Sequence, residues 1–241
     1  MGEGRENESF LKLSAILALS CIGCILLFGL RVAISGKTFY RYLIWNLLLA
    51  IVPYLIAVLG VQLMARSCPG HGRGLLTAAV ALLWLVFYPN APYIFTDFIH
   101  VINKTYLRAA PSEWLNLNAL LWYDLLMNAA FAFLGHFIGL VSMWLMQGGL
   151  TRVWGGRVAR IVVCVAIFFS GFGIYLGRFS RLNSWDLLFD LGKVASEVTE
   201  ALSDLKAILF SAVFALFILL TYVALIVFKR IELPAQDDRK D

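Results

Sequence analysis

Long apolar stretches without charge alternate along the chain with short segments that hold most of the charged residues. Residues 13–30, 42–64 and 207–228 are eighteen, twenty-three and twenty-two residues long and contain no charged side chain. A helix rises about 1.5 Å per residue, so about twenty residues cross the roughly 30 Å hydrocarbon layer of a bilayer. Further apolar blocks begin at Leu75, Ala119 and Ile161. The pattern therefore predicts six transmembrane helices.

The third apolar block is too short to cross a membrane as one helix. Its uninterrupted run ends at Phe87 after thirteen residues, which cover only about 20 Å. Pro89, Asn90 and Pro92 follow at membrane depth, where backbone that leaves the helical pattern must be satisfied by protein or by water. We therefore expect the third helix to be broken at Pro89–Pro92, with Asn90 capping a second helical segment.

A different pattern precedes the last apolar block. Between Asp190 and Leu205, apolar residues recur at helical spacing while acidic residues occupy the opposite face. This spacing predicts an amphipathic helix that lies on the membrane surface before the sixth span.

Composition agrees with this pattern and excludes a soluble globular chain, since 61% of the residues are hydrophobic and only 15% are charged. The net charge of +5 does not indicate nucleic-acid binding, because the basic residues are scattered through every loop. We predict an all-α polytopic membrane bundle with a single integral-membrane domain over residues 13–228. A cytoplasmic N-terminal segment, residues 1–12, and a disordered cytoplasmic tail, residues 229–241, would flank it.

Basic residues give a small preference for one orientation in the membrane. Six spans put both termini on one side, and that side holds eleven Lys and Arg residues against nine on the other. Because cytoplasmic loops are enriched in Lys and Arg, the bias predicts cytoplasmic termini in an inner (plasma) membrane. The eleven are Arg5, Lys12, Arg66, Arg73, Arg152, Arg157, Arg160, Lys229, Arg230, Arg239 and Lys240; the nine are Arg31, Lys37, Arg41, Lys104, Arg108, Arg178, Arg181, Lys193 and Lys206.

Polar residues gather at the ends of spans two to five on the non-cytoplasmic side. Polar and charged side chains near hydrocarbon are costly unless they are paired, so their co-location predicts one polar site. The predicted site residues are Asn46, Asn90, Tyr93, Asp97, His100, Asp124, Arg178, Arg181, Asn183 and Asp186.

Four motifs in these regions resemble a known family. They are WNLLLAIVPY from Trp45, YPNAPYIFTDFIH from Tyr88, WYDLLMNAAFAFLGHFIGLVS from Trp122 and GFGIYLGRFSRLNSWD from Gly171. In this order they resemble a bacterial family of multi-pass membrane proteins known only as a domain of unknown function, family thirteen sixty-one. The resemblance implies an integral-membrane fold and brings no reaction, cofactor or substrate with it.

The predicted site residues allow two chemical interpretations. Asp97, Asp124 and His100 could act as acid–base groups or, with Asp186, hold a divalent metal, since oxygen ligands with one imidazole suit such ions. Arg178 and Arg181 would then bind an anion, because guanidinium pairs with phosphate in a bidentate manner. The alternative is structural, with Asp97 and Asp124 neutralised by these two arginines.

Three functions follow from these interpretations. The site could belong to a membrane-embedded enzyme acting on a phosphate-bearing amphiphile. It could instead be the ion or solute site of a transporter with a discontinuous helix. The third possibility is a non-catalytic membrane partner protein whose polar network only secures the fold. The expected contacts are the lipid bilayer and an amphiphilic or anionic substrate, with no nucleic acid.

Overall fold

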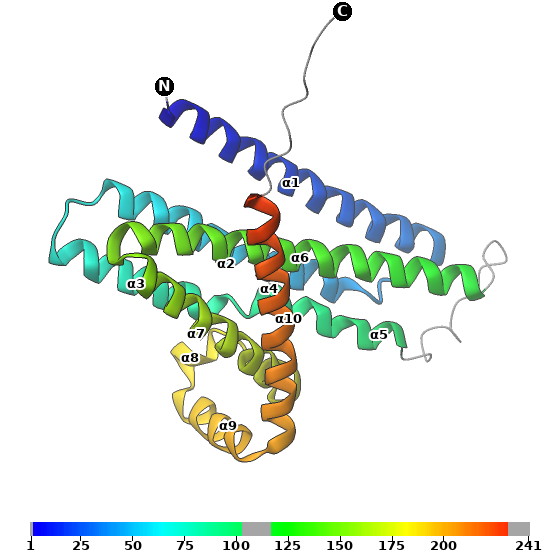
Figure 1. The fold of residues 1–241 in the computed structure, drawn as a ribbon. Helices are drawn as coiled ribbons and strands as arrows, with labels where there is room; N and C mark the ends of the chain where they lie inside the picture. The colour runs from blue at the N-terminus through cyan, green and yellow to red at the C-terminus, as the bar shows by residue number, and fades with distance from the viewer. Residues whose placement is uncertain (1, 103–116, 231–241) are drawn as a thin grey trace, which may run out of the picture.

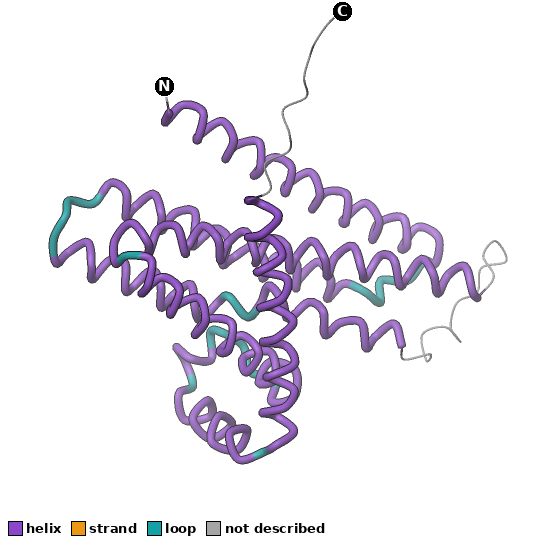
Figure 2. The backbone as a smooth tube through the Cα atoms, in the orientation of Figure 1, coloured by secondary structure: helices purple, strands orange, loops and turns teal. Residues whose placement is uncertain are grey.

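A computed structural model describes residues 2–102 and 117–230, which are helical almost throughout (Figures 1 and 2). Six helical segments in this part are long and apolar enough to cross a membrane, which makes the chain a multi-pass membrane protein. The helices are α1 (Gly2–Ser35), α2 (Arg41–Arg66), α3 (His71–Phe87), α4 (Asn90–Tyr93), α5 (Phe98–Ile102), α6 (Leu117–Trp154), α7 (Gly156–Tyr175), α8 (Asp186–Phe189), α9 (Leu191–Ser203) and α10 (Leu205–Arg230). A 3₁₀ turn (Ile94–Asp97) joins α4 to α5, and a π-helical turn (Leu176–Ser180) extends α7.

Helix α6 is the central element of the bundle. It packs along α2 and also contacts α1, α3, α7 and the bent segment that follows α3. In the apolar stretch of α6 that is long enough to span the membrane, 61% of the residues are buried, against 11% in α1 and 17% in α10. Helix α10 packs chiefly against α7 and crosses α6 at a steep angle in Figure 1. Helices α1 and α10 therefore present most of their surface to lipid.

The third span bends where the sequence predicts a break, but its backbone stays helical. Tyr88, Pro89 and Ile94 all keep right-handed helical dihedral angles, and the chain tightens into the 3₁₀ turn before α5 begins. The prediction that Asn90 caps the second segment is wrong, because Pro89 occupies the cap position and no side chain bonds there. A proline is tolerated in a first helical turn, where backbone N–H groups lack intrahelical partners. The prolines therefore redirect the helix without unwinding it.

Helical structure continues past residues 13 and 228, the predicted ends of the integral-membrane domain, and the domain itself stays a prediction. Helix α1 begins at Gly2, so most of the predicted N-terminal segment is helical, and α10 continues through Lys229 and Arg230. The rest of the predicted tail, residues 231–241, lies outside the described residues, as do Lys104 and Arg108. The amphipathic helix before the last span is present as α9, with Asp190 accepting a hydrogen bond from the Lys193 N–H at its start.

A buried serine on α6 ties three spans together. The Ser142 hydroxyl accepts a hydrogen bond from Trp84 Nε1 on α3 at 2.8 Å and donates to the Pro53 carbonyl on α2 at 2.8 Å. Trp84 and Ser142 are both fully buried. In hydrocarbon no water is available to accept a hydrogen bond from the indole N–H, so the bridge fixes the relative positions of these helices.

Replacing Ser142 with alanine is expected to lower the free energy of unfolding by about 1–2 kcal/mol, because Trp84 Nε1 then loses its partner. Ser170→Ala is the matched control, since this equally buried hydroxyl bonds only to the Ala166 carbonyl of its own helix. Thermal unfolding in detergent would measure both. Equal losses in the two variants would contradict a bridging role for Ser142.

Candidate functional site

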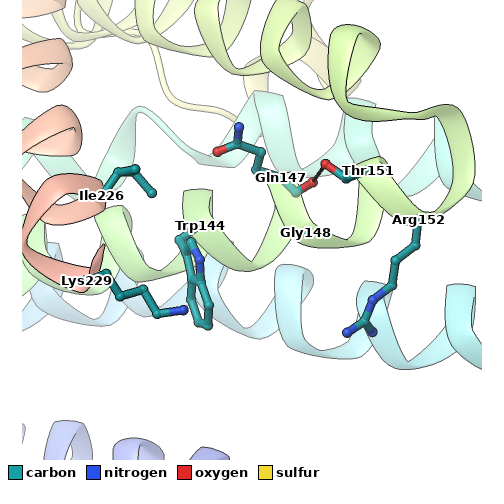
Figure 3. A pocket seen from close by; sticks show the side chains of 7 residues that line it. All are labelled: Trp144, Gln147, Gly148, Thr151, Arg152, Ile226 and Lys229. Atoms are coloured by element: carbon teal, nitrogen blue, oxygen red, sulfur yellow. Dashed lines mark hydrogen bonds between the residues drawn. The ribbon is translucent and has the colours of Figure 1, made fainter. Parts of the chain in front are cut away.

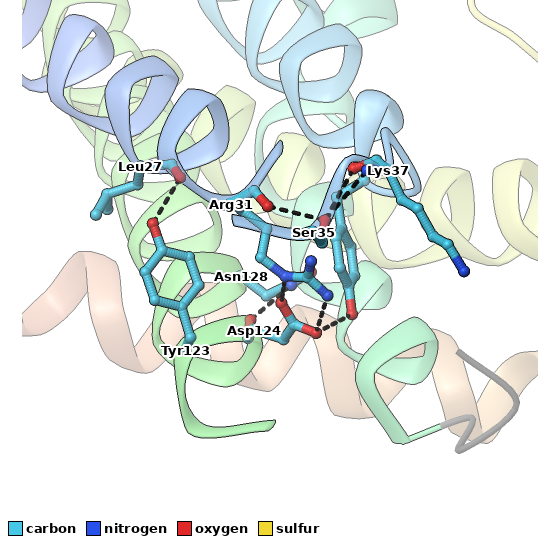
Figure 4. A network of polar contacts seen from close by, with 8 residues as sticks. Leu27, Arg31, Ser35, Lys37, Tyr123, Asp124 and Asn128 are labelled. Atoms are coloured by element: carbon cyan, nitrogen blue, oxygen red, sulfur yellow. Dashed lines mark hydrogen bonds and ion pairs between the residues drawn. The ribbon is translucent and has the colours of Figure 1, made fainter. Parts of the chain in front are cut away.

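Asp124 on α6 forms a buried ion pair with Arg31 on α1 (Figure 4). Arg31 Nε donates to Asp124 Oδ1, and Arg31 Nη2 donates to Oδ2 at 3.0 Å. The Tyr40 hydroxyl adds a third hydrogen bond to Oδ2 at 2.9 Å. The side chains of Arg31 and Asp124 are 5% and 1% exposed. Such a bidentate, desolvated pair leaves this carboxylate with little capacity for a ligand.

Asp124 is thus neutralised by an arginine, as the structural interpretation expects, but that arginine is Arg31 and neither Arg178 nor Arg181. Arg31 was assigned to the boundary of the first span, whereas its side chain turns inward from the last turns of α1. Arg181 is exposed and takes a left-handed conformation with a φ of 54°. No ion pair joins Arg181 to a carboxylate in the part of the chain that the structure describes.

A second polar cluster, called the Asp97 cluster below, lies at the end of the bent third span. It consists of Asn46, Asp97, His100 and Arg178. Asn46 Nδ2 donates to Asp97 Oδ2 at 2.6 Å, while Arg178 Nη1 lies 3.8 Å from Oδ1. Arg178 Nη2 lies 3.3 Å from His100 Nε2. Because a guanidinium only donates, this contact requires a neutral imidazole with its proton on Nδ1. Asp97 is 2% exposed, whereas the Arg178 side chain is 21% exposed.

Local helix geometry explains how these four side chains meet. Asp97 and His100 are three residues apart across the junction of the 3₁₀ turn and α5, which puts both on one side of the segment. Gly177 lets Tyr93 approach closely, since a Cβ there would lie 3.1 Å from the tyrosine ring. The π-helical turn that contains Gly177 then presents Arg178 to the cluster.

Two tyrosines that sequence reasoning missed connect the two clusters. The Tyr40 ring lies 5.7 Å from the guanidinium carbon of Arg31 and 6.0 Å from the Tyr42 ring. Tyr42 in turn lies 4.6 Å from the imidazole of His100. The run Tyr40-Arg41-Tyr42, where α2 begins, was the available signal, but aromatic residues at the end of a span are ordinarily interface residues.

Of the remaining predicted residues, Asn183 lines an apolar cavity between α3, α7 and α9, and Asn90 bonds to Ser184 in its wall. Asn90 Nδ2 donates to Ser184 Oγ at 3.1 Å, and Ser184 donates to the Val86 carbonyl. Asp186 accepts a hydrogen bond from the Asn183 backbone N–H, which closes a local turn. The cavity measures about 340 Å³, and most of its walls are apolar, including Leu85, Pro89, Phe169, Phe172, Leu176, Val194 and Val198.

The structure does not bring the predicted metal ligands together. Among the described residues, no three His, Cys, Asp or Glu side chains lie close enough to share an ion. Asp97 and His100 lie in one cluster, whereas Asp124 is held in the other by Arg31 and Tyr40. Asp186 bonds within its own turn. The single predicted site is thus two linked clusters and a neighbouring cavity.

Comparison with known families agrees with this architecture. A family model described as "Protein of unknown function (DUF1361)" matches residues 45–221, well over half of the chain. The chain belongs to this family. No curated protein and no solved structure matches the chain.

The range matched by the DUF1361 model includes one of the two clusters completely and the other only in part. All four residues of the Asp97 cluster, Asn46 included, lie within the matched range. Asp124 also lies within it, but Arg31 and Tyr40 precede its first residue. The matched part of this DUF1361 chain therefore contains a complete Asp97 cluster and only the acidic half of the buried ion pair.

Proposed function

We propose that this DUF1361 protein is a membrane-embedded enzyme that binds an anionic, phosphate-bearing amphiphile and acts on its head group. The observation that carries the proposal is the contact of one partly exposed arginine, Arg178, with both Asp97 and His100. Arg178 would bind the anion and Asp97 would act as the acid–base group. The buried ion pair at Asp124 has a structural role in this proposal.

The loose geometry of Arg178 supports anion binding. Its 3.8 Å separation from Asp97 exceeds hydrogen-bond distance, so the guanidinium is not saturated by the carboxylate. Arginine has five N–H donors, and a phosphate oxygen can take the ones that face outward. The neutral imidazole of His100 lies beside this guanidinium and adds an N–H donor on Nδ1 for the same anion.

The neighbouring cavity supports an apolar tail on the same substrate. Pro89 lines the cavity and Asp97 ends the 3₁₀ turn, so one bent segment connects the two features. On the other wall, Leu176 lines the cavity and Arg178 follows two residues later. A volume of about 340 Å³ with apolar walls suits part of an acyl chain better than a polar solute. This favours an amphiphile over a small ion, which a transporter with a broken helix would carry.

The same proposal places the protein in an inner (plasma) membrane with cytoplasmic termini. The excess of basic residues on the terminal side supports this orientation. The Asp97 cluster then opens toward the non-cytoplasmic leaflet.

Asp97→Asn tests the acid–base role. Purified protein in detergent would be incubated with short-chain phosphatidic acid or phosphatidylglycerol, and ³¹P NMR would follow the head group. We expect wild type to convert one of these probes and Asp97→Asn to lose at least about a hundredfold in rate, the scale of a general acid–base contribution. Arg178→Gln should weaken probe binding. Glu200→Gln on α9 is the control, since it removes an exposed carboxylate away from the cluster.

Fold integrity separates this proposal from a purely structural network. We expect Asp97→Asn to unfold within a few degrees of wild type, because Asn46 can hydrogen-bond to an amide as well as to a carboxylate. The enzymatic proposal would be contradicted if Asp97→Asn lowered the unfolding temperature as much as Asp124→Asn and wild type converted no probe. That result would favour the partner-protein alternative.

A further inference from the structure

A second cavity lies at the opposite end of the bundle, between the C-terminal ends of α6 and α10. It is an open groove of about 520 Å³ lined by seven residues, and Figure 3 shows Lys229 and Arg152 at its two ends. Its lining residues are Trp144, Gln147, Gly148, Thr151, Arg152, Ile226 and Lys229. This set, called the terminal groove below, shares no residue with the Asp97 cluster or the apolar cavity.

The terminal groove lies at the edge of the hydrocarbon layer. Lys229 is the first charged residue after the uncharged run 207–228, and Arg152 is the first after the uncharged run 125–151. Trp144 lies two residues before Met146, where the apolar part of that run ends, a position typical of interface tryptophans. Phosphate groups of lipids and soluble phosphates can both reach this depth.

The groove is cationic and has donors in place. None of its seven lining residues is acidic, and two carry a permanent or nearly permanent positive charge. The Lys229 ammonium lies 3.4 Å from the centre of the Trp144 ring, which fixes it at the groove wall by a cation–π contact. Tyr222 donates to Gln147 Oε1, so the amide group of Gln147 has its NH₂ left to donate.

Gly148 keeps the floor of the groove open. A Cβ at Gly148 would meet no atom within 4 Å, whereas one at the adjacent Gly149 would lie 2.9 Å from the Val61 side chain. Gly149 is thus explained by helix packing against α2, and Gly148 is not. A residue without a side chain here allows a ligand to approach the α6 backbone between the two cations.

We propose that the terminal groove is a binding site for a phosphate group, held by Arg152 and Lys229 over the floor at Gly148. The shared chemistry is a phosphate group whose negative charge is not balanced by a cation of its own, and it can come from an anionic lipid head group or from a soluble phosphate. A role limited to neutralising the C-terminal ends of two helices needs neither the groove nor the open floor.

The test measures thermal unfolding of the full chain in detergent with three additives: phosphatidylglycerol, phosphatidylcholine and inorganic phosphate. A ligand that binds only the folded state raises the unfolding temperature with its concentration. We expect stabilisation by phosphatidylglycerol or by inorganic phosphate and none by phosphatidylcholine. Stabilisation by phosphatidylglycerol alone assigns the site to a lipid head group; stabilisation by inorganic phosphate as well assigns it to phosphate itself.

Matched variants identify where that stabilisation arises. In Arg152→Gln, the additive concentration needed for the same rise in unfolding temperature is expected to increase at least about tenfold, the scale of losing one charge-assisted contact. Gly148→Leu should do the same by filling the floor while keeping both charges. Arg157→Gln removes an exposed charge from the same side outside the groove and should leave the stabilisation unchanged. Phosphatidylglycerol is also a probe of the Arg178 site, so the groove and its variants are compared in an Arg178→Gln background, which keeps this result independent of the proposed function.

Three outcomes would overturn the proposal. An equal loss in Arg152→Gln and Arg157→Gln would mean that anions respond to general surface charge. A full response to phosphatidylglycerol in Gly148→Leu would mean that the groove itself is not the site. A role in helix-end stability alone would lower the unfolding temperature of Arg152→Gln without additive and leave its response to additive intact.

Discussion

Replacing Asp124 with asparagine is expected to destabilise the protein by about 3–5 kcal/mol, the range for a buried ion pair that loses one partner. The substitution leaves the Arg31 guanidinium buried at the contact between α1 and α6 with no countercharge. Among the described residues, Arg31 Nη1 has no hydrogen-bond partner even with the carboxylate present, so no second acceptor is in place to replace Asp124. Chemical or thermal unfolding in detergent, followed by circular dichroism, would measure the loss.

Two further variants divide this effect into its parts. Tyr40→Phe removes one hydrogen bond to the same carboxylate and should cost about 1.5–3 kcal/mol, less than the loss of the charge. The double variant Arg31→Met/Asp124→Leu removes both charges and should recover much of the stability, because an apolar pair needs no desolvation. If Asp124→Asn were no more destabilising than the exposed Glu200→Gln, the buried pair would not hold α1 to the bundle.

Replacing Gly171 with alanine is expected to force α7 and α10 apart. A Cβ at Gly171 would overlap the Ser211 carbonyl oxygen and lie 3.1 Å from the Ala215 backbone nitrogen. Both atoms belong to the α10 backbone, which cannot move aside as a flexible side chain would. Small residues at helix contacts in membranes allow this close approach. Overpacking of a core costs about 1–3 kcal/mol, and we expect the upper end here because backbone is displaced.

Gly23→Ala on α1 is the matched control for Gly171→Ala. A Cβ there meets no atom within 4 Å, so the substitution should be neutral or stabilise the helix by about 0.5–1 kcal/mol. The two variants make the same chemical change, and only the surroundings differ. A similar change in unfolding temperature for both would show that α7 and α10 do not pack as closely as Gly171 and Ser211 indicate.

The extent of sequence-based prediction differs between the fold and the site. The six spans, the interruption at Pro89 and the amphipathic helix before the last span all follow from patterns within about twenty residues of sequence. Each is a local property, since spanning length, proline geometry and helical periodicity do not depend on distant residues.

The site was predicted less completely because its pairings join distant residues. The sequence assigned Asp97 and Asp124 to one polar site and offered Arg178 as a partner, which is right for Asp97 only. Arg31 was missed because a charged residue at the end of an apolar run is normally a boundary residue. Ninety-three residues separate Arg31 from Asp124, and no local pattern encodes that distance.

By itself, the sequence determined that this chain crosses a membrane six times and where its third span bends. Hydrocarbon imposes these features on each segment separately, because every span must be long enough, apolar and internally hydrogen-bonded. Only the tertiary structure decided which charges neutralise each other. That choice depends on which helix faces meet, and in this bundle it pairs Asp124 with Arg31 and leaves Arg178 beside Asp97 partly exposed.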